Sequence, residues 1–115
     1  MAATVEVDVS WTGGMAFEGR GPSGHTVLLD AAAESGGENR GSRPMELLLV
    51  ALGGCTGMDV VSILKKMKQE ITGFRISVQG ERAPEHPKVY TDITLTYSLT
   101  GPALDPGKVA RAISL

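Results

Sequence analysis

An apolar segment that stops at two glycines and a cysteine constrains this chain most. Nearly every position from Met45 to Leu52 is apolar, and Gly53-Gly54-Cys55 follows at once. A helix that is apolar on all sides is buried in a core or an interface. Each glycine inside a helix costs about 1 kcal/mol relative to alanine. The sequence therefore predicts either two helices that meet at the glycines or one helix that is kinked there.

Cys55 is the only cysteine of the chain. If a second helix begins after the glycines, at a capping box in Thr56-Gly57-Met58-Asp59, then Cys55 lies just before free N–H groups. Such groups favour a thiolate, and the glycines leave room for a reactant to approach. Free cysteines are also often small, inert core residues. The residues alone leave both interpretations open.

Length, charge and composition exclude several classes of protein. The 115 residues suit one domain, and a net charge of −2 does not favour nucleic acid as a partner. No uninterrupted apolar run reaches the roughly 18 residues of a membrane span, so we expect no membrane partner. His25 and His86 lack neighbouring ligands, so we expect no metal. A start without signal-peptide features and a lone cysteine indicate the cytoplasm.

Alternating apolar residues predict antiparallel strands on both sides of the helical region. In the first part, Thr12-Gly13-Gly14 and Gly21-Pro22-Ser23-Gly24 are turn signals between three short strands. We expect these strands at 5–11, 15–20 and 26–30, and a second pair at 74–79 and 89–99.

The segments between and after the strands are a loop and two helix ends. Residues 31–43 form a polar loop that we expect to be partly mobile, and Ser42 is a candidate cap for the helix after it. We expect Gly73 to end the central helical region, and Asp105-Pro106 to begin a last helix. The apolar pattern of that helix is unfinished at Leu115, so we expect the chain to be part of a longer one.

Several motifs together resemble the OsmC/Ohr family of osmotically inducible and organic-hydroperoxide-resistance proteins, and most closely its YhfA-like branch. The similarity runs essentially from end to end as a single domain, 1–115, without the end of the family's C-terminal helix and its last strand. The residues that carry it are Gly41-Ser42-Arg43-Pro44-Met45-Glu46-Leu47-Leu48-Leu49, Gly53-Gly54-Cys55, Asp59-Val60-Val61-Ser62-Ile63-Leu64-Lys65-Lys66 and Val89-Tyr90-Thr91-Asp92-Ile93.

The resemblance implies an α+β fold in which antiparallel sheets wrap around a long buried central helix pair in an intertwined homodimer. It also implies a cysteine-based peroxidase without a cofactor. A thiolate, here Cys55, attacks an organic hydroperoxide and becomes a sulfenic acid. A second cysteine, which would lie beyond residue 115, resolves it, and an external dithiol restores the thiol.

The charged partners of the thiol depart from the family pattern. Met45 stands where the best-studied members have a glutamate, and Met15 stands where they have an arginine. We therefore expect Arg20 or Arg43 to favour the thiolate, with Glu46 orienting that arginine or simply favouring the helix start. Met45 and Met58 are either core residues or the lining of an apolar pocket for the hydroperoxide.

Two other functions fit the same residues. The first is a non-catalytic dimer of this fold that binds an apolar small molecule or a partner, because methionines replace the expected charges. The second is a structural dimer whose buried segment 45–52 is entirely interface.

Overall fold

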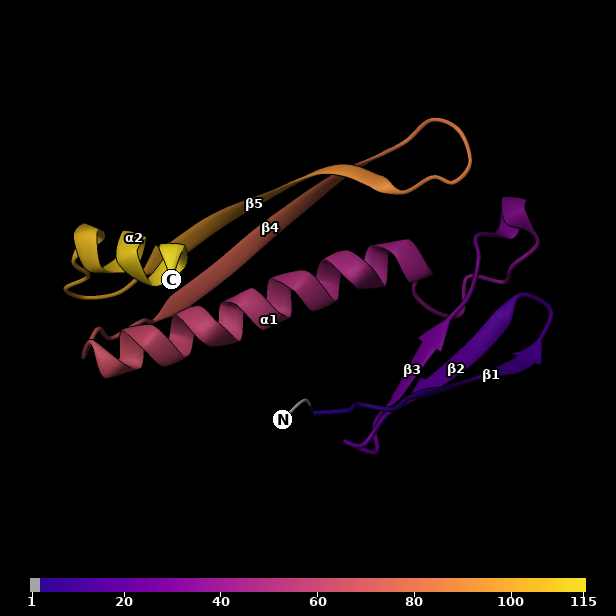
Figure 1. Cartoon of the computed structure of the whole chain (residues 1–115), viewed down its shortest axis with the longest axis horizontal. Helices are drawn as coiled ribbons and strands as arrows, with labels where there is room; N and C mark the ends of the chain where they lie inside the picture. Colours follow the sequence, from indigo (N-terminus) through magenta and orange to yellow (C-terminus); the bar gives the residue numbers. More distant parts are fainter. Residues whose placement is uncertain (1–2) are drawn as a thin grey trace. The chain divides into compact units, whose positions relative to one another are not determined.

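The computed structural model describes residues 3–115 of the chain. The chain divides into two compact units, with the boundary between Leu48 and Leu49. The elements follow in the order β1 (Asp8–Gly13), β2 (Ala16–Arg20), β3 (Thr26–Leu29), η1 (Ala33–Ser35), α1 (Pro44–Lys66), β4 (Gly73–Arg82), β5 (Tyr90–Thr100) and α2 (Pro106–Ser114) (Figure 1). This mixture of helices and small antiparallel sheets confirms the α+β class.

The first unit contains a three-stranded antiparallel sheet in the order β1-β2-β3, which confirms the predicted meander. Gly13 and Gly14 have φ values of 119° and 56°, which glycine adopts without a steric penalty, so the chain reverses tightly between β1 and β2. Beside this turn the indole N–H of Trp11 donates to the carbonyl oxygen of Gly14 at 2.9 Å.

The apolar residues of the first strand are exposed, although their alternation predicted a half-buried strand. Trp11 is 66% exposed, and Val5, Val7 and Val9 are exposed as well. Val5 and Val7 also precede the strand, which begins at Asp8. The apolar face was predicted correctly, but residues 3–115 leave it mostly open to solvent.

Residues 31–43 form a loop that contains local regular structure. A short 3₁₀ helix, η1, ends at Gly36, and the backbone of Ser42 bonds to both Leu28 and Asp30. Ser42 is therefore held against the end of β3, and Pro44 is the first residue of α1.

The helix α1 runs through Gly53 and Gly54 as one continuous element. Figure 1 shows α1 as a single unbroken helix. Two helices meeting at the glycines was the wrong alternative. An ideal Cβ atom on Gly53 would stand 3.1 Å from Val78, and one on Gly57 would stand 3.2 Å from Ile76. These glycines therefore let α1 approach β4 closely, and that packing outweighs their low helix propensity.

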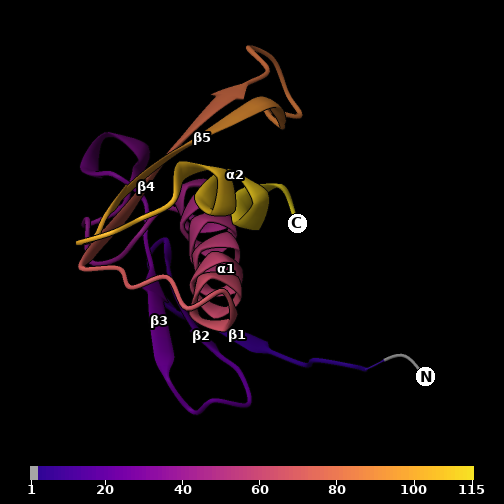
Figure 2. The same ribbon diagram turned by 90° about the vertical axis from the view of Figure 1, so that its left-hand side faces the viewer.

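The second unit packs the later part of α1 and the short helix α2 against the β4–β5 hairpin (Figures 1 and 2). Its core consists of Val60, Leu64 and Ala112, with half-buried neighbours from all four elements, among them Phe74, Tyr97 and Val109. The first helix turn of α2 is capped as predicted, since the Asp105 carboxylate accepts from the N–H groups of Gly107 and Lys108.

The end of α1 differs from its prediction. The helix stops at Lys66, and Lys68 has a left-handed backbone with a φ of 58°. Gly73 does not end the helix but begins β4.

By length and composition α1 could cross a membrane, because an 18-residue window of it has a mean hydropathy of 2.0. The lack of an uninterrupted apolar run therefore did not exclude a helix of membrane-spanning composition. Glycines and a few isolated polar residues interrupt the run but lower the mean hydropathy little. Of that window, 11% is buried within the chain. A buried core helix of a protein passes the same test of length and composition. The finding therefore shows that α1 has a large apolar surface, and it does not show whether lipid or protein covers that surface.

Candidate functional site

Cys55 lies in the middle of α1 and is exposed. Its position overturns the expectation that it precedes a helix N-terminus. Because the helix continues through residues 44–66, the N–H groups around Cys55 are inside the hydrogen-bonded ladder. A helix terminus therefore supplies no free donors to a thiolate here. The exposure also makes the inert core interpretation wrong for the single chain.

The helical neighbours of Cys55 leave its thiol open on one side and place a negative charge on another. Gly54 has no atom within 4 Å of the point where a Cβ would stand. Met58, three residues further along, is 76% exposed, so its core interpretation is wrong for the single chain. Asp59 lies four residues after Cys55, the spacing at which helix side chains are neighbours. Asp59 is therefore the acidic side chain of α1 nearest to Cys55 in helical spacing.

The other predicted site residues lie in the first unit, whereas Cys55 and Met58 lie in the second. Arg20 is exposed on β2, where its guanidinium donates to the Thr26 hydroxyl at 2.8 Å. Arg43 precedes α1 and donates to the Asn39 side-chain oxygen at 2.8 Å and to the Gly41 carbonyl oxygen at 3.0 Å. The two arginines thus remain separate candidates, each oriented by its own local partner.

Glu46 caps α1. Its carboxylate accepts from the backbone N–H of Arg43 at 3.2 Å, the return half of a capping box. On an α-helix, nine residues amount to two and a half turns and about 13 Å, so Glu46 and Cys55 leave opposite sides of α1. This geometry supports the structural interpretation of Glu46. Met45, its neighbour, is half-buried.

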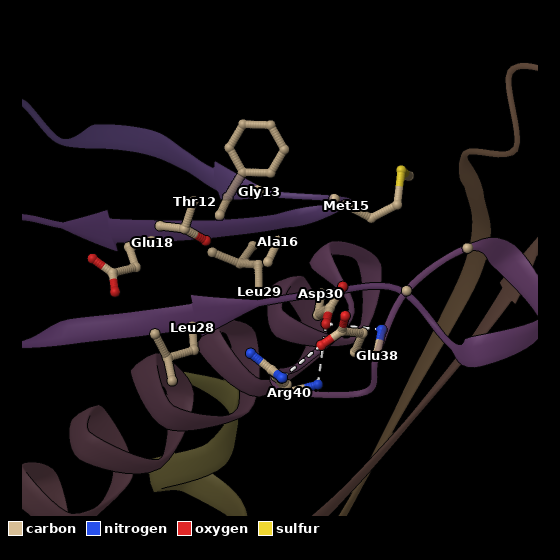
Figure 3. Close-up of a pocket in the computed structure, with 14 residues that line it drawn as sticks. Thr12, Gly13, Met15, Ala16, Glu18, Leu28, Leu29, Asp30, Glu38 and Arg40 are labelled. Carbon is tan, nitrogen blue, oxygen red and sulfur yellow. Dashed lines mark hydrogen bonds and ion pairs between the residues drawn. The ribbon is translucent and has the colours of Figure 1, made fainter.

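Asp30 is the polar residue that sequence reasoning missed. It is 4% exposed and follows β3 directly, beside a cavity of about 510 Å³ that Met15, Glu18 and Arg40 help to line (Figure 3). The N–H of Ala31, and to a smaller degree those of Arg40 and Glu38 and the charge of Arg43, lower the pKa of Asp30 although its burial acts in the opposite direction. The only signal in the sequence was an acid at the end of an apolar strand.

No group of three or more His, Cys, Asp or Glu side chains among residues 3–115 is arranged to hold a metal ion. The accessible thiol of Cys55, on an apolar helix, is the nucleophile that the described site residues offer.

Comparison with known proteins agrees with this architecture. The family model described as OsmC-like protein matches residues 36–115. The protein YhfA of Escherichia coli strain K12 is 39% identical over 111 residues, which are 96% of this chain and 80% of YhfA. A solved structure of a hypothetical protein from Aquifex aeolicus is 32% identical with a TM-score of 0.84, and the match covers 98% of this chain and 78% of that one.

A more distant solved structure has the same fold. It is an organic hydroperoxide resistance protein OsmC from Legionella pneumophila, with 16% identity, a TM-score of 0.68, and coverage of 99% of this chain and 82% of that one. The chain belongs to the OsmC/Ohr family of OsmC-like proteins. The resemblance that the Gly-Gly-Cys segment indicated, including that to the YhfA branch, is confirmed.

Proposed function

We propose that this protein is a cytoplasmic, homodimeric thiol peroxidase that reduces organic hydroperoxides, with Cys55 as the nucleophile. The observation that carries the proposal is the exposure of this lone thiol at the middle of the apolar helix α1. Membership of the OsmC/Ohr family supports the reaction class, as does the fold shared with a Legionella protein described as an organic hydroperoxide resistance protein.

The proposed reaction uses only the chain's own sulfur and an external reductant. The Cys55 thiolate attacks one peroxide oxygen, the O–O bond breaks, and the other oxygen leaves with a proton as an alcohol. Cys55 is thereby oxidised to a sulfenic acid. A resolving thiol, from a second cysteine beyond residue 115 or from an external dithiol, attacks the sulfenic sulfur and releases water. The external dithiol then reduces the resulting disulfide, becomes a disulfide itself and restores the Cys55 thiol.

The homodimer is supported by the apolar surface that one chain leaves open. On α1, Leu48 is 57% and Val50 65% exposed, and the apolar face that includes Trp11 is also open. Contiguous apolar surfaces of this kind mark interaction sites. A second copy would cover them, and Met45 and Met58 would then border an apolar site for the organic part of the peroxide.

The test is mass spectrometry of the protein after treatment with cumene hydroperoxide, with a Cys55→Ser variant as the control. We expect an added oxygen on the Cys55 peptide at low peroxide excess, trapped by a sulfenic acid reagent, and its removal by a dithiol. A wild-type protein that is oxidised no faster than free cysteine would refute the proposal.

A second candidate function is a non-catalytic dimer of this fold that binds an apolar small molecule. Asp59 favours it, since its carboxylate at helical spacing from Cys55 opposes the thiolate that catalysis needs. In that case Cys55 reacts with alkylating reagents like an ordinary thiol, and an apolar fluorescent probe binds the Cys55→Ser variant as well as the wild type.

A further inference from the structure

Residues 31–41 form a closed loop whose two ends lie side by side. The N–H of Asp30 donates to the carbonyl oxygen of Ser42 at 3.1 Å, and the N–H of Ser42 donates to that of Leu28 at 3.0 Å. Gly41 packs so closely on the backbone of Leu28 that a Cβ atom would collide with it. Compact surface loops with ends this close, known as Ω-loops, are frequently functional. Both ends of this loop are fixed at the end of β3, so any movement has to come from its middle.

The middle of the loop, residues 36–40, borders the cavity of about 510 Å³ (Figure 3). We call this segment the strap. The other lining residues of the cavity come from the β1–β2 turn, β2 and β3, and include Met15 and Leu28. The strap also lies close to that turn, because the Cγ atom of Met15 is 3.8 Å from the point where a Cβ atom on Gly36 would stand. A segment of a surface loop therefore closes one side of the cavity, entirely within the first unit.

Asp30 connects the strap to the end of β3. Among residues 3–115 it alone combines a charged side chain with burial. Its Oδ2 atom accepts from the N–H of Glu38 at 3.1 Å and from that of Arg40 at 3.2 Å, and its Oδ1 atom accepts from the N–H of Ala31 at 2.7 Å (Figure 3). Hydrogen bonds to an ionised acceptor are stronger than neutral ones. One buried carboxylate therefore holds two backbone groups of the strap.

The charged side chains around the strap leave this attachment to the backbone. Glu38 and Arg40 form an exposed ion pair of 2.8 Å with each other. Glu18, from β2, lines the same cavity. The N–H of Ala31 is the largest of the causes that lower the pKa of Asp30, so its carboxylate is ionised at neutral pH. The strap is thus held to Asp30 through its backbone N–H groups rather than through a side-chain ion pair.

We propose that the strap is a lid over this cavity and that the Asp30 carboxylate is the latch that holds it closed. When the N–H groups of Glu38 and Arg40 leave Oδ2, the strap moves away from Met15 and a small molecule can enter. Loops that open in this way belong to the least stable parts of a protein, which unfold locally while the rest stays folded. The lid concerns the first unit only and does not depend on Cys55.

Hydrogen exchange of single amides, followed by NMR in the full chain at low urea concentrations, tests the lid. The N–H groups of Glu38 and Arg40 exchange only when they leave Asp30. Opening of a lid exposes little surface, so their protection factors are expected not to change with urea below the unfolding transition. The amides of the β2–β3 ladder are the internal reference, because they exchange by unfolding and lose protection as urea is added.

Asp30→Asn tests the latch. The substitution keeps the size of the side chain but replaces one acceptor oxygen with an amide group, which faces backbone N–H groups. Charge-assisted hydrogen bonds are roughly twice as strong as neutral ones, so we expect the protection factors of Glu38 and Arg40 to fall at least about tenfold. The matched control is Glu38→Gln, which removes a charge from the strap but keeps the N–H that donates to Asp30. Its protection factors are expected to equal those of the wild type.

If Asp30→Asn does not fold, the urea dependence of the wild type and a Gly37→Ala variant carry the test. A Cβ atom on Gly37 would collide with the backbone of Ala31, so this substitution displaces the strap without changing the carboxylate. It is expected to lower the protection factors of Glu38 and Arg40 as well.

Access to the cavity is measured with a thiol placed inside it. Ala16 lines the cavity, so Ala16→Cys in a Cys55→Ser background puts the only thiol of the chain on its wall. Alkylation of this thiol by iodoacetamide is expected to become about tenfold faster when Asp30→Asn is added, in step with the loss of protection. Thr94→Cys on β5, in the same background, is the control whose rate should not change.

Three results would overturn the lid. Protection factors of Glu38 and Arg40 that fall with urea in parallel with the ladder would show that the strap opens only when the unit unfolds. Unchanged protection in a folded Asp30→Asn variant, or in Gly37→Ala where Asp30→Asn does not fold, would show that this attachment does not hold the strap. An Ala16→Cys thiol that reacts equally fast with and without the latch would show that the strap does not close the cavity.

Discussion

The Cδ1 atom of Ile76 lies 3.2 Å from the point at which a Cβ atom on Gly57 would stand. That contact is tighter than ordinary van der Waals packing, and Gly53 repeats it one turn earlier against Val78 at 3.1 Å. Gly54, between them, has open space beside it. Glycines that look alike in the sequence therefore differ in what they do, and alanine substitutions can separate them.

Gly54→Ala should stabilise the chain, because it removes backbone freedom from a helix interior without a clash. We expect the free energy of unfolding to rise by about 0.5–1 kcal/mol. Gly57→Ala is the matched comparison and should gain less or lose stability, since Ile76 has to move. Urea unfolding followed by circular dichroism measures both. A Gly54→Ala variant that is destabilised would mean that another chain fills the space beside Gly54.

Asp59→Asn should make Cys55 more reactive. The substitution removes a negative charge from the position four residues after the thiol, which is worth a few tenths of a kcal/mol and about a twofold faster alkylation at pH 7. Asp105→Asn removes the same charge elsewhere and preserves an N-cap, so it serves as the control. Equal rates for Asp59→Asn and the wild type would show that this carboxylate does not act on Cys55.

The contribution of Asp30 to stability should disappear in acid. Its pKa is lowered, first by the N–H of Ala31, from an ordinary value of 3.8, so the folded protein binds this proton more weakly than the unfolded chain. The stabilisation is therefore complete above pH 4 or so and is lost as the pH falls through the lowered pKa. Thermal unfolding of the wild type and Asp30→Asn should differ at pH 7 and converge at low pH. A gap that stays constant into acid would contradict this.

Val50→Lys should separate the proposed dimer. Val50 is 65% exposed on α1 in the single chain, so a lysine there is tolerated by the monomer but would be buried by a second copy. An unpaired buried charge costs several kcal/mol, so we expect at least about a hundredfold weaker association. Light scattering during size-exclusion chromatography without detergent measures it, with Thr94→Lys on β5 as the control. A wild type that is monomeric, or that requires detergent, would argue against the dimer.

Local patterns were sufficient to predict most of the elements. Period-two alternation located the strands to within a few residues, and Asp105 followed by Pro106 located the start of α2, because cap and turn chemistry depend on a few adjacent residues. The two-helix alternative for the Gly-Gly-Cys segment was wrong because the helix there depends on distant residues. Its helix propensity is locally poor, and only the distant strand residues Val78 and Ile76 explain why the helix continues.

The candidate site was less predictable than the fold. Cys55 stood out because it is the only cysteine, and Arg43 and Glu46 because they surround the helix start. Asp30 had no such signal, because its role depends on N–H groups that the chain brings back from eight and ten residues further along. Hydrophobic periodicity and composition do not specify the path of a loop. A residue whose hydrogen bonds hold a loop together can therefore be recognised only from the structure.

Trp11 gives this protein an intrinsic optical probe. It is the only tryptophan of the chain, its indole N–H is held by Gly14, and its ring faces solvent on the open apolar face of β1. Indole fluorescence moves to shorter wavelengths when water leaves its surroundings. If a second copy covers this face, dilution of the unlabelled wild type should move the emission maximum of Trp11 to longer wavelengths as the copies separate.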